Sequence, residues 1–225
     1  FMAIELVVFD LGSTLFEYKN MPLSWADYYK TAFEYVNNAL SLGVSDEKIN
    51  HAEYVMRMFN PRINPREIDY PPEFIFARAL DGWNVPDLNS AINLFFESFN
   101  LKTEIYTESI PVLTALKQKG VTLAALTDVP SGMPDSLYKK GIEPLLPCFD
   151  DYLSSCSLGV RKPNPHGLTL LMQKYKLLPN EVLFVGDEDK DFETAKNANC
   201  WFIRVDKNKK HEKSIQTVEK LLELF

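Results

Sequence analysis

Cysteine is scarce in this chain of 225 residues: it occurs only at Cys148, Cys156 and Cys200, with no CxxC spacing. An odd number of scattered cysteines argues against the disulfide framework of a small secreted domain and favours a reducing compartment. No secretory leader is recognised, and Phe1 ahead of Met2 indicates the remnant of a cloning tag. No apolar run approaches the roughly 20 residues that cross a bilayer. We therefore expect a cytoplasmic protein with no membrane partner.

Positive charge is also in short supply. The chain has 24 Lys and Arg against 31 Asp and Glu, which gives a formal net charge of -7 and a pI near 5.1. A nucleic-acid-binding surface needs a basic patch, and the single local cluster, at residues 207–211, is typical of a solvated loop. We expect no nucleic-acid partner and a monomer or homodimer. Hydrophobic residues make up 46% of the chain, which is enough for a sizeable core.

Short apolar runs rich in β-branched and aromatic residues recur along the chain and predict buried strands. They lie at residues 4–9, 121–126, 152–155, 182–185 and 201–205. Helical patterns follow the later runs, at residues 134–140, 166–175, 192–199 and 213–224. Strands that alternate with helices favour parallel pairing with right-handed crossovers. The sequence therefore predicts an α/β fold with a Rossmann-like, doubly wound parallel sheet.

Residues 17–105 have a different character. They contain helical patterns at residues 24–42, 46–59, 72–80 and 87–99, and no convincing strand. Ser24 and Ser45 are suitable N-caps, and Gly43 and Gly82 are suitable helix ends. A block of this length is too long for a simple crossover and needs its own small core. We predict an inserted all-helical cap domain at 17–105 and a core domain formed by 1–16 and 106–225.

Polar side chains follow four of the five predicted strands. In open α/β sheets, reactive groups gather at the carboxyl ends of the strands. Carboxylates there can hold a hard divalent cation, while an ammonium and a hydroxyl group can bind phosphate oxygens. The candidates are Asp10, Thr127, Asp128, Arg161, Lys162, Asp187 and Asp191.

The segments that carry these residues are VVFDLGSTL, LAALTDVP, SLGVRKPNP and VLFVGDEDKD. In this order they resemble the four motifs of the haloacid dehalogenase superfamily, in the branch with a helical cap between the first and second motifs. The resemblance covers essentially the whole chain. It implies a Mg²⁺-dependent hydrolase of a small phosphate ester or acyl phosphate, with a small phosphorylated metabolite as its partner.

The resemblance also implies a role for each residue. Asp10 would be the nucleophile that forms an aspartyl-phosphate, and Asp10, Asp187 and the backbone carbonyl of Gly12 would bind Mg²⁺. Asp191 would hold water and the Lys162 ammonium in place. Thr127, with Asp128 and Lys162, would bind the substrate phosphate.

One position departs from the family pattern. Typical family phosphatases carry a second aspartate two residues after the nucleophile, and here that position is Gly12. This aspartate protonates the leaving group and activates water, and losing such a group typically costs about 10²–10⁴ in rate. Three interpretations stay open. The enzyme is slow or uses leaving groups that need no proton, another carboxylate such as Asp128, Glu17 or Asp27 substitutes, or the protein is catalytically silent and binds a phosphorylated ligand.

Two other activities occur in relatives that lack this aspartate. A 2-haloacid dehalogenase needs no metal, and the acid pair Asp187 and Asp191 argues against it. A phosphonatase would need a cap lysine that forms a Schiff base, for which Lys19, Lys30 and Lys48 are candidates by location only. In the cap, Arg62 and Arg66 are further candidates for a contact to phosphate. The cap aromatics, Trp25 among them, are expected to form mainly the cap core, and any that faces the cleft would shape substrate choice.

Overall fold

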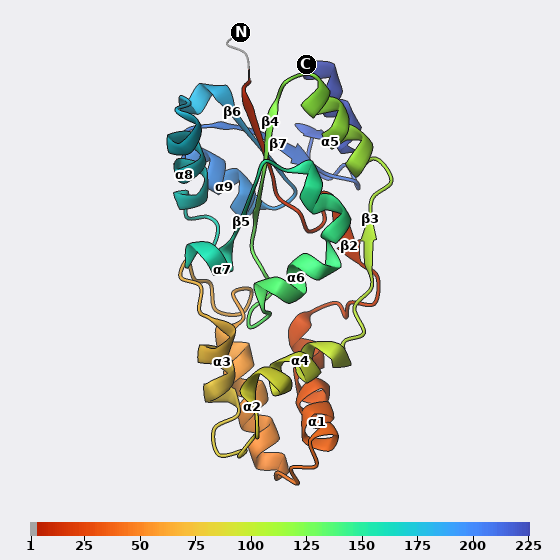
Figure 1. The fold of residues 1–225 in the computed structure, drawn as a ribbon, viewed down its shortest axis with the longest axis vertical. Helices are drawn as coiled ribbons and strands as arrows, with labels where there is room; N and C mark the ends of the chain where they lie inside the picture. The colour runs from red at the N-terminus through yellow and green to blue at the C-terminus, as the bar shows by residue number, and fades with distance from the viewer. Residues whose placement is uncertain (1–3) are drawn as a thin grey trace.

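A computed structural model describes residues 4–225, so Phe1 and the first residues of the predicted core domain lie outside the described part. A six-stranded sheet organises the larger part of the molecule (Figure 1). Every neighbouring pair in this sheet is parallel. The order is β5 (Asp151–Ser154), β4 (Thr122–Thr127), β1 (Leu6–Phe9), β6 (Val182–Gly186), β7 (Trp201–Val205) and β8 (Ser214–Ile215).

Helices cover both faces of the sheet, which explains why the central strands are apolar throughout. All four residues of β1 are buried, and they alternate between two hydrophobic clusters. Val7 and Phe9 pack on the side of α5 (Ser109–Gln118) and the terminal 3₁₀ helix η4 (Val218–Leu224). Leu6 and Val8 pack on the side of α8 (His166–Tyr175) and α9 (Asp189–Asn197). The doubly wound α/β architecture predicted from the sequence is confirmed.

Residues 25–99, here called the helical module, lie beyond one end of the sheet (Figure 1). Ser24 caps the 3₁₀ helix at Trp25–Tyr28 and Ser45 caps the α-helix at Asp46–Phe59, as expected. An aromatic core holds it together, with Phe95 at 4.8 Å from Phe33 and 5.1 Å from Phe76 between ring centroids. The module consists of η1 (Trp25–Tyr28), α1 (Tyr29–Ala39), α2 (Asp46–Phe59), α3 (Pro72–Ala79) and α4 (Leu88–Ser98).

Two connections join the module to the sheet. At its base, β2 (Phe16–Tyr18) pairs antiparallel with β3 (Thr103–Ile105), so the segment 17–105 is not helical to its ends. On the opposite side, Ile68 forms an antiparallel bridge with Val160 in the loop that follows α7 (Ser155–Leu158). The predicted domain boundaries fall within the β2–β3 pair, and the division into two domains stays a prediction.

Several elements differ from the sequence prediction. The pattern at 213–224 is not one amphipathic α-helix: Ser214 and Ile215 pair with β7, and a 3₁₀ helix follows at Val218–Leu224. Pairing with a sheet edge here overrides the local helical pattern. Helix α9 begins at Asp189 rather than at 192, and helix α5 and strands β2, β3 and β8 were not predicted.

The remaining short elements are α6 (Asp135–Gly141) and the 3₁₀ helices η2 (Glu143–Cys148) and η3 (Pro179–Glu181). Within residues 4–225, no helix combines the length and the apolar character that crossing a bilayer requires.

Candidate active site

The carboxyl ends of β1, β4 and β6 bring three predicted residues together. Asp10 directly follows β1, Thr127 ends β4 and Asp187 directly follows β6. Because β1 lies between the other two strands in parallel register, these positions are neighbours along one edge of the sheet. Strands β4 and β5 lie on one side of β1 and β6, β7 and β8 on the other, and such a reversal in strand order opens a crevice at this edge. The helical module faces the same edge (Figure 1).

A buried lysine and three carboxylates form the centre of the site. Lys162 Nζ lies 2.6 Å from Asp10 Oδ1 and 2.5 Å from Asp191 Oδ1, and its side chain is 2% exposed. One carboxylate oxygen each of Asp10, Asp187 and Asp191 lies within 4.8 Å of the other two. The ammonium group therefore points at the acidic cluster and not into bulk water.

One ammonium group does not neutralise three carboxylates in a buried setting. Burial raises the pKa of Asp10 well above its ordinary value, against the lowering effect of Lys162, and Asp191 and Asp187 raise it further. Burial and the Asp191 carboxylate raise the pKa of Asp187 to about 6. Burial alone would lower the pKa of Lys162, but the surrounding carboxylates raise it well above its ordinary value. The cluster thus carries an excess of negative charge that a cation would relieve.

Asp191 is fully engaged by the protein itself. Its Oδ1 faces Lys162, while its Oδ2 accepts hydrogen bonds from the backbone amides of Asp187 at 3.1 Å and Glu188 at 2.9 Å. Gly186 permits this close packing, because a Cβ atom there would lie 2.5 Å from Asp191 Oδ2. Asp191 therefore holds Lys162 and the start of α9 in place.

The loop after β1 contributes a residue that the sequence analysis missed. Thr14 Oγ1 lies 3.4 Å from Asp10 Oδ2 and 3.3 Å from Asp187 Oδ1. The sequence feature that could have identified Thr14 as a site residue is its position four residues after Asp10. Gly12 lies in the same loop, and a Cβ atom built on it would meet nothing within 4 Å. The backbone at this position therefore has room for a Cβ atom.

Thr127 and Asp128 have protein partners of their own. The Thr127 hydroxyl lies 2.7 Å from the hydroxyl of Tyr138, a residue of α6 that sequence reasoning did not select. Asp128 accepts a hydrogen bond from the Lys162 backbone amide at 3.2 Å and lies 3.3 Å from Lys190 Nζ. Burial favours the neutral form of Asp128, but the cations Lys162, Lys190 and Arg161 outweigh it and lower its pKa.

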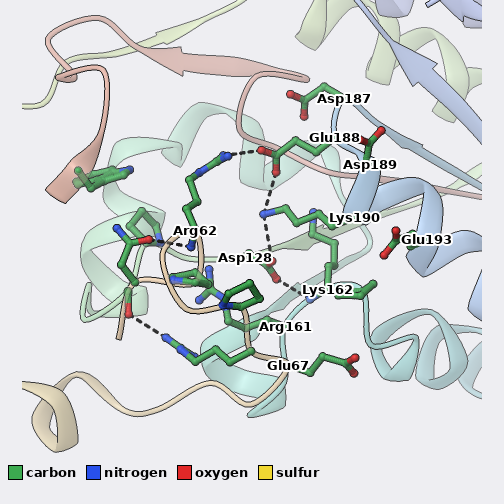
Figure 2. Close-up of a pocket in the computed structure, with 18 of the residues that line it drawn as sticks. Arg62, Glu67, Asp128, Arg161, Lys162, Asp187, Glu188, Asp189, Lys190 and Glu193 are labelled. Atoms are coloured by element: carbon green, nitrogen blue, oxygen red, sulfur yellow. Dashed lines mark hydrogen bonds and ion pairs between the residues drawn. The ribbon is translucent and has the colours of Figure 1, made fainter. Parts of the chain in front are cut away.

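Two neighbouring cavities of about 910 Å³ and 530 Å³ open beside this centre, and both are lined by Asp128, Asp187, Glu188 and Lys190. Such volumes are typical of small-molecule sites. Arg62 reaches the cavities from the helical module and forms an ion pair with Glu188 at 2.5 Å (Figure 2). Glu188 also pairs with Lys190 at 2.9 Å, and Lys190 pairs with Asp128, so these charges form a continuous chain (Figure 2).

The other cap residues considered from the sequence differ in their placement. Arg66 lines the larger cavity, but its guanidinium group is committed to Asp69, Ser131 and backbone carbonyls. Lys19, Lys30 and Lys48 line neither cavity, which leaves a phosphonatase without a candidate lysine among them.

Arg161 is buried beside Lys162 and forms an ion pair with Asp69 at 3.2 Å, so it contacts the loop before α3.

The family model of the haloacid dehalogenase-like hydrolases matches residues 4–199. The chain belongs to this family. Among solved structures, it is similar to a 2-haloacid dehalogenase from Pseudomonas syringae, with a TM-score of 0.65, 22% identity and coverage of 98% of this chain and 97% of the other. It is also similar to a HAD phosphatase from Thermococcus onnurineus, with a TM-score of 0.64, 18% identity and coverage of 98% and 97%. At these identities the two likenesses establish the fold.

Curated sequence relatives are phosphoglycolate phosphatases. The chain is 38% identical to that of Vibrio vulnificus over 120 residues, which is 51% of each protein. It is 30% identical to that of Vibrio cholerae over 140 residues, which is 60% of this chain and 61% of the relative. The chain thus spans about half to three fifths of the length of these relatives.

Proposed function

We propose that this protein is a Mg²⁺-dependent phosphohydrolase that transfers the phosphoryl group of a small phosphorylated metabolite to Asp10. The observation that carries the proposal is the contact of Asp10 with the buried Lys162 ammonium beside Asp187. A carboxylate attacks phosphate poorly unless positive charge offsets the mutual repulsion. The similarity to phosphoglycolate phosphatases supports a phosphate ester as substrate.

The donor set fits a magnesium ion. Asp10 and Asp187 offer hard oxygen ligands with excess negative charge between them, and such oxygens suit Mg²⁺. Asp10, Asp187 and the Gly12 carbonyl are the groups that would hold the ion, while both oxygens of Asp191 are occupied by Lys162 and two amides. When bound, the ion would neutralise charge on the phosphate and the carboxylates.

Asp10, Lys162 and Thr127 have different roles in the proposed reaction. The Asp10 carboxylate attacks phosphorus, the bond from phosphorus to the leaving oxygen breaks, and that oxygen departs with the electron pair. Lys162 and the Thr127 hydroxyl stabilise the charge that develops on the transferring group. Water then attacks the phosphorus of the aspartyl-phosphate, which releases inorganic phosphate and restores Asp10. No side chain at Gly12 protonates the leaving oxygen, so an ester or acyl phosphate with a stable leaving anion reacts best.

The helical module serves as the cap of this enzyme. Trp25 and Arg62 extend from it into the cavities, so its position decides how a substrate enters and how much water remains. The direct test is phosphate release from phenyl phosphate with Mg²⁺, which Asp10→Asn and chelation of the metal should abolish. Asp81→Asn, at an exposed residue of the module, serves as the matched control. Turnover that survives Asp10→Asn would contradict the proposal, and ligand binding without any turnover would favour a silent binding protein.

A further inference from the structure

The smaller cavity, of about 530 Å³, has walls of two kinds. Asp10, Thr127, Asp128 and Asp187 line its polar side, where the transferring phosphoryl group would sit. Apolar and aromatic side chains form a second part of its lining, alongside the charged Glu17, Arg62, Glu188 and Lys190. The apolar and aromatic members, here called the aromatic wall, are Phe16, Tyr18, Met21, Leu23, Trp25 and Tyr138.

The aromatic members of this wall form a connected series. Ring centroids lie 6.1 Å apart for Tyr138 and Phe16, 5.3 Å for Phe16 and Tyr18, and 6.0 Å for Tyr18 and Trp25. All three pairs have edge-to-face geometry, which is favourable for aromatic rings. The series begins at Tyr138 of α6, beside Thr127, and ends at Trp25 of the helical module, so it runs along the cavity away from Thr127.

Carboxylates near the cavity do not supply the proton donor that Gly12 lacks. Asp128 is held by Lys190 and the Lys162 amide, and Glu188 by Arg62 and Lys190. Glu17 pairs with Lys19 at 2.7 Å. Each of these three carboxylates is already engaged by a cation. Asp27, the other carboxylate considered from the sequence, lines neither cavity.

The cavity offers no unpaired cation for a substrate carboxylate either. Arg62 and Lys190 are the basic side chains that line the smaller cavity, and each already faces acidic partners. A phosphoglycolate-like substrate would need an acid for its alkoxide leaving group and a free cation for its carboxylate. The described residues around this cavity provide neither.

We propose that the substrates are aryl phosphates, whose aromatic ring packs on the wall formed by Tyr18, Leu23, Trp25 and Tyr138. This inference rests on the proposed function and specifies its substrate class. A phenol has a pKa of about 10, as the side chain of tyrosine has, whereas the pKa of water and of simple alcohols is about 16. When Asp10 attacks phosphorus, the P–O bond breaks and the phenolate departs with the electron pair, taking its proton afterwards from solvent. Gly12 and the aromatic wall therefore favour the same leaving group.

The test compares phenyl phosphate, acetyl phosphate and 2-phosphoglycolate with the same enzyme and Mg²⁺. Acetate is a better leaving group than phenolate, so chemistry alone favours acetyl phosphate. We expect kcat/KM for phenyl phosphate to exceed that for acetyl phosphate by about tenfold or more, because only the ring buries apolar surface. 2-Phosphoglycolate should be the poorest of the three.

Leu23 provides a probe of the wall that does not endanger folding, because its side chain is fully exposed. Leu23→Asn should raise the KM for phenyl phosphate severalfold and the KM for acetyl phosphate much less, because it removes apolar surface without adding a charge that would repel both anions. Leu178→Asn, at an exposed leucine that lines neither cavity, is the matched control and should change neither value. Higher kcat/KM for acetyl phosphate or 2-phosphoglycolate, or an equal effect of Leu23→Asn on both substrates, would overturn the aryl assignment and leave the phosphohydrolase intact. No turnover of any of the three would overturn the proposed function itself.

Discussion

The hydroxyl of Tyr138 lies 2.7 Å from Thr127 Oγ1, and both side chains are buried. Burial raises the pKa of Tyr138 well above its ordinary value, so the phenol stays protonated and can donate to Thr127. The Thr127 hydroxyl hydrogen is then left for a phosphate oxygen in the cavity. Tyr138 is in this way a positioning residue for Thr127.

Removing the hydroxyl in Tyr138→Phe should lower kcat about three- to tenfold, because one orienting hydrogen bond contributes about 0.5–1.5 kcal/mol. The same change in a Thr127→Val background should have almost no further effect, because the two hydroxyls act as one unit. Steady-state kinetics of the double-mutant cycle measure this coupling. Tyr35→Phe, whose hydroxyl contacts exposed Glu97, is the control. Additive effects of the two substitutions would contradict the positioning role.

Gly12→Asp should be accepted by the fold, because a Cβ atom at this position meets nothing within 4 Å. The new carboxyl group would supply the missing acid and base, so turnover of alkyl phosphates should rise by tenfold or more, within the roughly 10²–10⁴ that such groups contribute. Aryl phosphates should gain much less. Gly12→Asn, which has the same shape without a titratable group, separates proton transfer from simple filling of space. Equal gains for Asp and Asn would contradict this explanation.

Asp187→Asn should stabilise the metal-free protein near neutral pH. The pKa of Asp187 is about 6 in the fold against 3.8 in the unfolded chain, so between these values the folded state binds more protons. The free energy of unfolding therefore falls as pH rises through this interval, by on the order of 2 kcal/mol. Thermal unfolding with chelator should show that the wild type is less stable at about pH 7.5 than at about pH 5. The contribution of Asp187 to this difference should be absent in Asp187→Asn.

Magnesium supplies the second half of the same experiment. Magnesium should raise the unfolding temperature of the wild type at about pH 7.5 and raise it much less at about pH 5, because metal binding needs ionised carboxylates. It should not raise the unfolding temperature of Asp187→Asn. Asp189→Asn, at a neighbouring and 84% exposed side chain, is the control. A magnesium shift that persists in Asp187→Asn would show that the ion binds elsewhere.

Asp69 should be important for stability. Its carboxylate is 4% exposed and pairs with Arg161 at 3.2 Å and with Arg66 at 3.0 Å, which joins the loop before α3 to the loop that carries Lys162. Asp69→Ala would leave two largely buried guanidinium groups without their carboxylate, at a cost of about 3–5 kcal/mol. Urea unfolding measures this cost. Glu223→Ala removes an exposed ion pair with Lys220 and should cost at most about 1 kcal/mol. Similar losses for both variants would contradict the role of Asp69.

Local sequence patterns predicted the sheet and its polar edge because each pattern lies within one short segment. The β1 and β6 runs are continuously apolar, as strands covered on both faces must be, and Asp10 and Asp187 directly follow them. Helix α8 occupies the predicted residues 166–175. Parallel order along the sheet then suffices to place the two carboxylates side by side.

Features that depend on contacts between distant segments could not be predicted in this way. Tyr138 reaches Thr127 only because α6 folds back over the carboxyl end of β4, and Arg62 reaches Glu188 across 126 positions of the chain. The three-residue strand β3 is too short to produce a period-two pattern, and it exists because β2 pairs with it. The paired state of Asp128, Glu188 and Glu17, which bears on the missing acid, likewise emerges only from the folded arrangement.

The central claim is that Asp10 carries the phosphoryl group during turnover, and its most direct test is mass spectrometry of enzyme quenched with acid during steady-state hydrolysis of phenyl phosphate. Without a side chain at Gly12 to activate water, the aspartyl-phosphate should accumulate. We predict that the peptide containing Asp10 gains the mass of one phosphoryl group, only with Mg²⁺ present, and that Asp10→Asn abolishes the gain. Phosphate release with no labelled peptide, or a label on another residue, would contradict the account.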